Sequence, residues 1–499
     1  MTSPTKKPDP TLRRFGTDGF TIRDRRFQEE QLASITFWGG VGTVTGSKYL
    51  IETERARVLV DCGLFQGLKE LRELNWQDPP FDARSLNAVL ITHAHIDHTG
   101  YLPRLIRHGF HGPIYCSRGT ADLLKILLPD AARLQEEDAD YRNRHQVTKH
   151  APALPLYTEE DAEATLRLIH PVVNTGERIE VAPGVIASFR IAGHILGSSL
   201  VLLELANAGA TGQGRRVLFS GDLGHYDQPI IRDPMAPPGC DYLLVESTYG
   251  DRLHDPENPK IGLARIINDA AKRDAPVLIP AFAVGRTQEI VYLIRELEDE
   301  KAIPVLPVTV DSPMAAAATR AYAARTEEQD EGYASVLGLQ RHPLRTNSMT
   351  TATSKEESKR LNDSRGARVI ISASGMMTGG RVLHHALRMV PDPDTTLVFV
   401  GFQAAGTTGR RIQDGEQQVK ILGQYVPVRC RIAKIGGFSA HADWKEVLRW
   451  LEGMASGIPN RTFLTHGEPL AAASMASHIK ERFGWQVHVP QYGERVELL

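Results

Sequence analysis

The sequence predicts an α/β protein of two or three domains, and three observations support this. The chain has 499 residues, of which 41% are hydrophobic and 24% are charged, as is typical of globular proteins that bury a core. Before residue 251, short apolar runs that end at glycine or acidic residues predict strands. After residue 251, strand-like and helix-like segments alternate, which favours βαβ units around a parallel sheet.

Predicted strands dominate the first half of the chain. Residues 1–33 are polar and predict a loosely ordered extension. A helix is expected within 158–169, because Thr158 is followed three residues later by Asp161, a typical capping pattern. The strands are predicted within 34–52, 56–65, 86–95, 215–224 and 241–251.

The second half of the chain combines strands with helices. A strand and a following helix are predicted within each of 275–297, 307–324 and 367–387. The last predicted strands lie within 429–451 and 461–469, and their loops contain histidine.

Composition excludes several classes of protein. The four cysteines are far apart and form no CxxC motif, which argues against a disulfide scaffold and against a zinc site built from cysteine. No run of about 20 apolar residues is present, and the N-terminal segment lacks the apolar core of a signal peptide. We therefore expect a cytoplasmic enzyme.

Charge is unevenly distributed along the chain, although the net charge is only −2. Residues 341–430 carry a net charge of +6, and residues 251–340 carry −5. Two interpretations remain open. The segments form differently charged solvated faces, or a basic wall lies over an acidic metal cleft and attracts a polyanion.

The strongest functional motif is THAHIDHTG at 92–100, directly after an apolar run. Imidazole and carboxylate groups are zinc ligands, and no ordinary packing requirement places four of them within six positions. The four residues are His93, His95, Asp97 and His98. One loop cannot complete two metal sites, so further ligands are expected after other strands, among small residues. The candidates are His194, Asp222 and His466.

This set of motifs resembles the metallo-β-lactamase superfamily and, within it, the β-CASP nucleases. The pattern H-x-H-x-D-H is followed by a distant His, an Asp and a late His. Three further motifs carry the resemblance, namely Glu246 in VESTYGDR, His441 in GGFSAHAD and His466 in LTHGE. The chain is most similar to bacterial and archaeal relatives of the nuclease subunit of the cleavage and polyadenylation specificity factor.

The resemblance implies a domain organisation. A metallo-β-lactamase αββα sandwich is expected from residues 34–250 and 431–499. A β-CASP α/β domain on a parallel sheet, residues 251–430, is expected as an insertion, with the active site in the cleft between the two domains. Residues 1–33 then form an N-terminal extension.

The resemblance also assigns ligands to two zinc ions. One zinc ion is expected to be held by His93, His95 and His194, and the other by Asp97, His98 and His466, with Asp222 bridging the two. Asp61 is expected to hold a ligand histidine from behind and to determine its tautomer. The alternative for Asp61 is a turn residue after a strand.

The activity implied is that of a zinc-dependent ribonuclease on single-stranded RNA. A hydroxide activated by two metal ions attacks the phosphodiester and leaves 5′-phosphate and 3′-hydroxyl ends. Asp97, Glu246 and His441 are the expected catalytic residues. His441 protonates the leaving oxygen and Glu246 orients its ring. The alternative for His441 is a structural role. Endonuclease and 5′-exonuclease action are not distinguished.

RNA is favoured over DNA because the DNA-repair members of this branch have an apolar residue at the position of His466. Three glycine-rich junctions between a strand and a helix are candidate phosphate sites, since helix N-termini bind anions. The alternative is that they are ordinary turns of a parallel sheet. The residues concerned are Gly285, Arg286, Thr287, Ser374, Gly375, Arg381, Arg410 and Arg411.

Three other functions compete with this interpretation. The first is a catalytically silent RNA-binding scaffold, and the second is a DNA-directed nuclease of the same branch. The third is a small-molecule hydrolase of the glyoxalase type, which would lack the roughly 180 residues between Glu246 and the last motifs. The family likeness also makes a homodimer possible.

Overall fold

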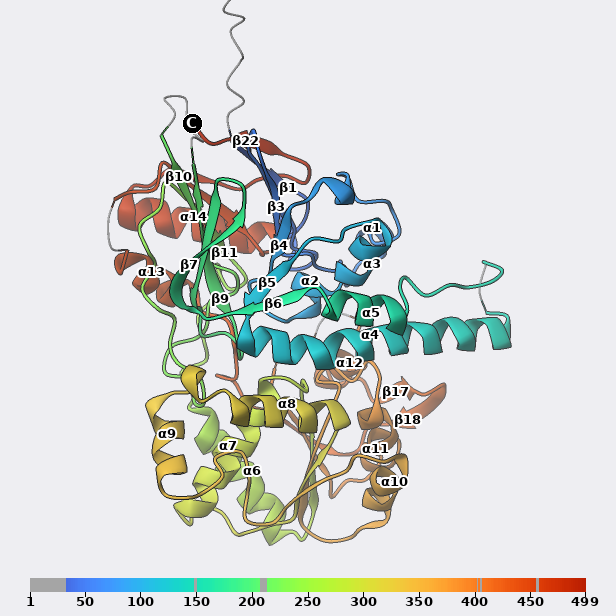
Figure 1. Ribbon diagram of the computed structural model, residues 1–499. Helices are drawn as coiled ribbons and strands as arrows, with labels where there is room; N and C mark the ends of the chain where they lie inside the picture. The colour runs from blue at the N-terminus through green and yellow to red at the C-terminus, as the bar shows by residue number, and fades with distance from the viewer. Residues whose placement is uncertain (1–32, 148–149, 207–212, 402, 404–405, 455–456) are drawn as a thin grey trace, which may run out of the picture. The chain divides into compact units, whose positions relative to one another are not determined.

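A computed structural model describes residues 33–147, 150–206, 213–401, 403, 406–454 and 457–499 (Figure 1). The predicted extension therefore lies outside the described residues, apart from Ala33. The described residues contain two seven-stranded sheets, one six-stranded sheet and a two-stranded hairpin. Among them, no helix combines the length and the apolar character needed to cross a membrane.

The first seven-stranded sheet begins as an antiparallel meander and continues with parallel strands. Its first three strands in the chain are joined by glycine-containing and charged turns, as the sequence predicts. In spatial order the strands are β22 (Arg495–Glu497), β1 (Ser34–Phe37), β2 (Tyr49–Glu52), β3 (Arg57–Val60), β4 (Ala88–Leu90), β5 (Ile114–Ser117) and β6 (Ile169–Val172).

The second seven-stranded sheet joins segments that are distant in the sequence. β11 pairs in parallel with β20 and places Glu246 opposite Thr465. β10 pairs in parallel with β11 and antiparallel with β9. In spatial order the strands are β21 (Val487–His488), β20 (Arg461–Thr465), β11 (Tyr242–Glu246), β10 (Arg215–Phe219), β9 (Ser199–Leu205), β8 (Val185–Ile191) and β7 (Thr175–Ala182).

Alternation of side chains along these strands builds two separate cores. In β10, Val217 and Phe219 pack between the two sheets, while Leu218 faces the opposite side, as the two-residue period of a strand requires. The outer layer against Leu218 is formed by α13 (Trp444–Glu452) and α14 (Pro469–Phe483), which lie behind the second sheet in Figure 1.

Helices also cover the outer face of the first sheet, so the predicted αββα layering is confirmed. The predicted capping pattern is confirmed as well, because Thr158 and Asp161 form a reciprocal capping box at the start of α5. The helices on this side are α1 (Lys69–Leu74), α2 (Ile96–Thr99), α3 (Leu102–Arg107), α4 (Arg118–His145) and α5 (Glu159–Leu166).

The six-stranded sheet is entirely parallel, as expected from the strand–helix alternation. In spatial order its strands are β14 (Met349–Thr351), β13 (Val308–Asp311), β15 (Arg368–Ser372), β12 (Pro276–Pro280), β16 (Thr396–Phe399) and β19 (Arg431–Lys434). The accompanying elements are α6 (Pro259–Lys272), α7 (Arg286–Asp299), α8 (Pro313–Ala324), α9 (Glu331–Gly338), α10 (Lys355–Asp363), α11 (Arg381–Met389), α12 (Thr408–Gln413) and the hairpin of β17 (Gln418–Ile421) and β18 (Gln424–Pro427).

The loop that follows β8 is held by two side chains from α8 and the turn after it, which accompany the six-stranded sheet. The Leu196 N–H donates to Tyr322 Oη over 3.2 Å, and the Gly197 N–H donates to Glu328 Oε2 over 2.5 Å. Burial raises the pKa of the Glu328 carboxyl to about 7. The loop that carries His194 is therefore fastened to the helical segment around α8.

Candidate metal centre

The functional side chains gather because each follows a strand whose carboxyl end lies on the same side of the fold. The loop after β4 carries His93 and His95. β8 and β10 are both antiparallel to β9, so His194 and Asp222 emerge at one end of the second sheet. β20 runs parallel to β11 and adds His466 at that end.

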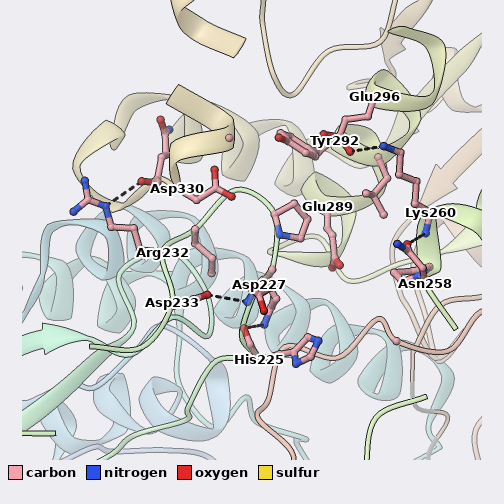
Figure 2. Close-up of a pocket in the computed structure, with 18 of the residues that line it drawn as sticks. His225, Asp227, Arg232, Asp233, Asn258, Lys260, Glu289, Tyr292, Glu296 and Asp330 are labelled. Atoms are coloured by element: carbon pink, nitrogen blue, oxygen red, sulfur yellow. Dashed lines mark hydrogen bonds and ion pairs between the residues drawn. The ribbon is translucent and has the colours of Figure 1, made fainter. Parts of the chain in front are cut away.

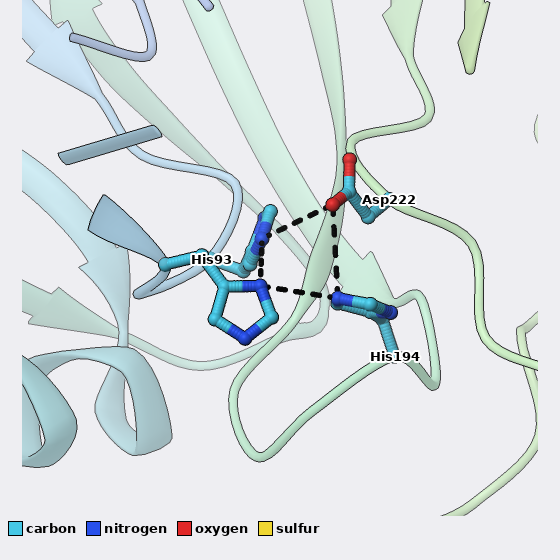
Figure 3. A group of neighbouring side chains, drawn as sticks. His93, His194 and Asp222 are labelled. Atoms are coloured by element: carbon cyan, nitrogen blue, oxygen red, sulfur yellow. Dashed lines mark hydrogen bonds and ion pairs between the residues drawn. The ribbon is translucent and has the colours of Figure 1, made fainter. Parts of the chain in front are cut away.

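His93, His194 and Asp222 point toward one another (Figure 3), and His95 belongs to the same group of possible metal ligands. His95 Nδ1 lies 3.1 Å from His93 Nε2 and 3.2 Å from His194 Nε2. Asp222 Oδ2 lies 3.4 Å from His93 Nε2 and 3.6 Å from His194 Nε2. Zinc bonds of about 2.0–2.1 Å in a tetrahedron separate neighbouring ligand atoms by about 3.3 Å. The four atoms thus match the donor set of a zinc ion.

A second group shares the other oxygen of Asp222. Asp222 Oδ1 lies 3.4 Å from His98 Nε2 and 3.4 Å from His466 Nδ1. His466 Nε2 lies 3.2 Å from Asp97 Oδ2. In the part of the chain that the structure describes, His98 Nε2 and Asp222 Oδ1 are buried without a hydrogen-bond partner. Buried polar atoms normally have partners, so this pair fits a cation.

The electrostatics of the site favour cations. Burial and the neighbouring imidazoles hold the pKa of His93 and His194 well below the usual value, so both rings offer a lone pair to a metal. Burial opposes protonation of His98 too, but the carboxylates of Asp222 and Asp61 raise the pKa of His98 well above its usual value. This position therefore demands positive charge.

Asp61 supports the site from behind. Its Oδ2 lies 2.7 Å from His98 Nδ1, and its Oδ1 accepts the Thr92 N–H over 2.8 Å. Asp61 and His466 both adopt positive φ angles, 58° and 50°, which are uncommon for residues other than glycine and cluster at functional sites. The backbone is thus bent to bring these two side chains into place.

Replacing Asp61 with asparagine is expected to weaken zinc binding by about 10–100-fold, the usual effect of losing an outer carboxylate that orients a ligand histidine. Competition with a chelator of known affinity measures this. Asp414→Asn is the control, because Asp414 is an exposed carboxylate paired with Arg410 on α12. Equal zinc affinity in Asp61→Asn and wild type would contradict the role.

Glu246 and His441 form a pair beside the metal ligands. Glu246 Oε1 lies 3.1 Å from His441 Nδ1 and also accepts the Leu223 N–H over 2.8 Å. Burial favours neutral His441, but the adjacent Glu246 carboxylate outweighs it and raises the pKa of His441 to about 9. His441 Nδ1 also lies 3.9 Å from Asp222 Oδ2. The chain therefore presents a protonated imidazole next to the predicted metal site.

Comparison with known proteins identifies the family. The metallo-β-lactamase superfamily model matches residues 41–281, the Beta-Casp domain model matches residues 287–412, and the RNA specificity domain of Zn-dependent metallo-hydrolases matches residues 425–490. Ribonuclease TTHA0252 of Thermus thermophilus is 36% identical over 460 residues, which cover 92% of this chain and 98% of that protein. The chain belongs to the β-CASP family of the metallo-β-lactamase superfamily.

Two archaeal relatives and one solved structure extend this comparison. Transcription termination factor FttA of Pyrococcus abyssi is 31% identical and covers 93% of this chain and 71% of its own length. FttA of Methanocaldococcus jannaschii is 29% identical, with 91% and 70% covered. A crystal structure of a protein of unknown function from Enterococcus faecalis V583 has a TM-score of 0.53 at 12% identity, covers 94% of this chain and all of its own, and supports the fold alone.

As a β-CASP protein, the chain is an enzyme, a metal-dependent hydrolase. The matched domain of Zn-dependent metallo-hydrolases and the histidine and aspartate groups of the site support zinc as its metal. The candidate metal ligands predicted from the sequence lie close together beyond the ends of neighbouring strands.

The predicted phosphate contacts of this β-CASP protein have internal partners. Arg286 pairs with Glu289, and Thr287 Oγ1 donates to Phe282 O over 2.7 Å. Arg381 Nη1 donates to Asp311 Oδ1 over 2.8 Å. The remaining two arginines, which are more exposed, lie on α12 and pair with carboxylates just after it: Arg410 with Asp414 and Arg411 with Glu416.

Two of the predicted phosphate positions lie in the loop before α11. Ser374 Oγ is 3.1 Å from Thr378 Oγ1, and Gly375 O accepts from Gln403 Nε2 over 3.0 Å. Phosphate binding at Gly285 and at the other predicted positions stays a prediction. For the four arginines, phosphate binding requires that each side chain leave its carboxylate partner.

A cleft of about 1120 Å³ lies beside His225 (Figure 2). Among the described residues that line it, eight carboxylates outnumber one lysine and one arginine. Lys260 is itself paired with Glu296 over 3.2 Å. Like charges repel, so this cleft does not suit an RNA backbone, and a polyanion is better accommodated elsewhere.

The sequence did not single out three side chains near His441. His225, His254 and Glu446 form a further group of side chains that could hold a metal ion. Each stands alone in the sequence, on a different segment. The available signal was the pattern Asp443-x-x-Glu446, which predicts a capping box at the start of a helix and which the structure contains.

Proposed function

We propose that the protein is a zinc-dependent ribonuclease that hydrolyses single-stranded RNA. The observation that carries this proposal is the pairing of buried Glu246 with half-buried His441 beside the proposed metal ligands, because a chain that only binds RNA has no need of an acid–base pair there. A relative named a ribonuclease and a match to an RNA specificity domain support RNA as the substrate.

Two zinc ions are proposed, sharing Asp222. One would be held by His93, His95, His194 and Asp222, and the other by Asp97, His98, His466 and Asp222. When bound, zinc lowers the pKa of water towards neutrality and offsets the negative charge of the phosphodiester. The support is strongest for the first of the two ions, because the donor atoms of its group are 3.1–3.6 Å apart, a spacing that suits one zinc ion.

The chain itself supplies the proton that the reaction needs. When water attacks phosphorus and the bond to the 3′ oxygen breaks, that oxygen leaves with negative charge. His441 is the proposed donor of a proton to it, since its raised pKa keeps the ring protonated at neutral pH. Glu246 holds the ring at Nδ1 and leaves Nε2 for the substrate. The products are then a 5′-phosphate and a 3′-hydroxyl.

Domain boundaries form part of the proposal. We place the start of the β-CASP segment at residue 251, as the sequence predicts. We place its end at the end of β19, a few residues after the predicted end at residue 430. β19 pairs in parallel with β16 and completes the edge of the six-stranded sheet, from Arg431 to Lys434. A homodimer also stays a prediction, and light scattering of the purified protein tests it.

Replacing Glu246 with glutamine is expected to move the alkaline limb of the pH–rate profile to lower pH, by about one unit or more. A general acid is active below its pKa, and activity falls as pH rises through that value. Removal of the carboxylate lowers the pKa of His441 from about 9, so activity is lost earlier. Measuring cleavage from pH 6 to 10 at constant zinc tests this.

The control is Glu452→Gln. Glu452 is the last residue of α13 and forms an exposed ion pair with Arg482 on α14. This variant is expected to leave the profile unchanged. An alkaline limb that stays in place in Glu246→Gln would show that Glu246 does not set the protonation of His441.

Cleavage of RNA labelled at either end tests the function directly. Zinc-loaded protein is expected to cleave single-stranded RNA, to lose this activity with a chelator and to regain it with added zinc. Duplex RNA and single-stranded DNA of the same sequence are the controls. Folded, zinc-loaded protein that leaves RNA intact would refute the nuclease and favour the scaffold, and preferential DNA cleavage would favour a DNA nuclease. The product ladder separates endonuclease from 5′-exonuclease action.

A further inference from the structure

A second set of charged side chains lies next to His441, outside the metal ligands. We call His225, His254 and Glu446 the Glu446 clamp. Glu446 Oε1 lies 2.7 Å from His225 Nδ1 and accepts the Tyr226 N–H over 3.0 Å. Glu446 Oε2 lies 3.3 Å from His254 Nε2 and accepts the Asp443 N–H over 3.1 Å. Figure 2 shows His225 at the edge of the cleft.

The distances between His225 and Glu446 are those of an ion pair, whereas His254 Nε2 lies 3.3 Å from Glu446 Oε2 and has no hydrogen-bond partner among the described residues. His225 Nδ1 lies 2.7 and 2.8 Å from the two carboxylate oxygens, whereas donor atoms in the first metal group are 3.1–3.6 Å apart. Burial lowers the pKa of His225, but Glu446, with Asp443 and Glu289 further off, raises the pKa above its usual value. The Glu446 carboxylate thus favours the protonated form of His225, and hydrogen bonds between charged partners are the stronger ones.

Glu446 joins the two segments that surround His441. On one side it holds His225 and the Tyr226 N–H, which follow the metal ligand Asp222. On the other side it forms a capping box with Asp443, two residues after His441. The His254 N–H donates to Asp443 Oδ2 over 3.1 Å, and this hydrogen bond connects Asp443 to the loop after β11.

Backbone pairing brings the two segments into register. The His225 N–H donates to Ala440 O over 3.1 Å, and the Ala442 N–H donates to Leu223 O over 2.8 Å. Between these bonds, Gly224 and His441 form an antiparallel bridge. No larger residue fits at position 224, because a Cβ atom there would lie 2.0 Å from Gly193 O, so the backbone of the ribbon packs directly against the loop after β8. The position of His441 relative to Asp222 thus depends on this short ribbon.

We propose that Glu446, charge-paired with His225, is a positioning residue for His441. It locks the ribbon of residues 223–226 and 439–443, so that the His441 ring stays aimed at the substrate beside Asp222. This inference rests on the proposed role of His441 as proton donor. In this proposal the clamp acts through the ribbon rather than through contact with RNA or metal.

Steady-state cleavage of single-stranded RNA by zinc-loaded variants tests the clamp. Glu446→Ala is expected to lower kcat about 10–100-fold, as losses of outer supporting groups do, with KM within about twofold and unchanged zinc content. Glu446→Gln provides a second variant of nearly the same shape. The matched control is Glu452→Gln on the same helix, in an exposed ion pair, for which kcat is expected to be unchanged.

Rescue separates charge pairing from mere packing. His225→Ala is expected to lower kcat, and His225→Arg is expected to restore most of it, because a guanidinium is permanently charged and donates two N–H groups to a carboxylate. If His225→Arg is no better than His225→Ala, or if Glu446 variants keep the wild-type kcat, the clamp is refuted. Loss of one metal equivalent in Glu446→Ala would also refute it and would show a third metal site instead.

Hydrogen exchange distinguishes failure of the clamp from failure of the proposed function. Amides of residues 438–446 are expected to exchange faster in Glu446→Ala than in wild type, whether or not RNA is cleaved. If wild-type protein cleaves no RNA but these amides exchange faster in Glu446→Ala, the proposed nuclease function is wrong and the proposal that the clamp holds the ribbon stands. Equal protection in variant and wild type refutes the clamp.

Discussion

His441→Ala is expected to reduce RNA cleavage by roughly 10²–10⁴-fold, the usual contribution of a general acid, with zinc content and folding unchanged. The ring contacts Glu246 and lies near Asp222 but belongs to neither proposed ligand group. Its removal therefore deprives the leaving oxygen of a proton without releasing metal. Single-turnover cleavage combined with metal analysis of the same sample measures both quantities.

The control for this variant is His384→Ala, since His384 is an exposed histidine on α11. It is expected to cleave RNA at the wild-type rate. Loss of zinc from His441→Ala would mean that His441 is a ligand, and wild-type cleavage would mean that its protonated ring is not used. Some substrates have a leaving group that needs no protonation, for example a p-nitrophenyl ester of a nucleotide, which releases p-nitrophenolate. The rate of cleavage of such a substrate is expected to fall less in His441→Ala than the rate of RNA cleavage does.

Asp222→Asn is expected to remove most zinc from both groups and to bring cleavage down to the background level. One Asp222 oxygen faces His93 and His194, and the other faces His98 and His466. An amide has one acceptor oxygen and no charge, so it cannot serve two cations among these imidazoles. Metal analysis after dialysis is expected to give less than one zinc ion per chain.

Asp241→Asn is a suitable comparison for Asp222→Asn, because Asp241 lies just before β11 and accepts the Arg216 N–H away from the site. It is expected to retain wild-type zinc content and cleavage. If Asp222→Asn retains two zinc ions per chain, the residue does not bridge two metals. Added zinc that restores cleavage in this variant would likewise show that the carboxylate is dispensable.

The clustering of the candidate metal ligands could be anticipated because short-range patterns report them. Four donors stand within six positions after a strand, and the others directly follow strands whose ends the fold brings together. The capping box at α5 is equally local and is confirmed. Less local features were missed. α4 runs through Pro129 for 28 residues, although proline usually ends a helix.

Side-chain pairing across distant segments was beyond the sequence pattern. Nothing near Arg381 in the sequence reveals that Asp311, 70 residues earlier, pairs with it in the structure. Arg286 is a local case, because its partner Glu289 lies three residues later on the same helix. The Glu446 clamp is the converse case. Its members come from three separate segments, and only the packing of α13 against the second sheet brings Glu446 to His225.

The pairing of β20 with β11 has a consequence for the synthesis of the protein. His441 and His466 are translated almost 200 residues or more after Glu246, and β20 must dock beside β11 before His466 reaches Asp97. Long-range strand pairing of this kind is late and slow in folding. A nascent chain on the ribosome therefore lacks the complete set of site histidines until residue 466 has been added. Under the proposed ribonuclease function, the growing chain cannot cleave the messenger from which it is being made, because it has no complete site.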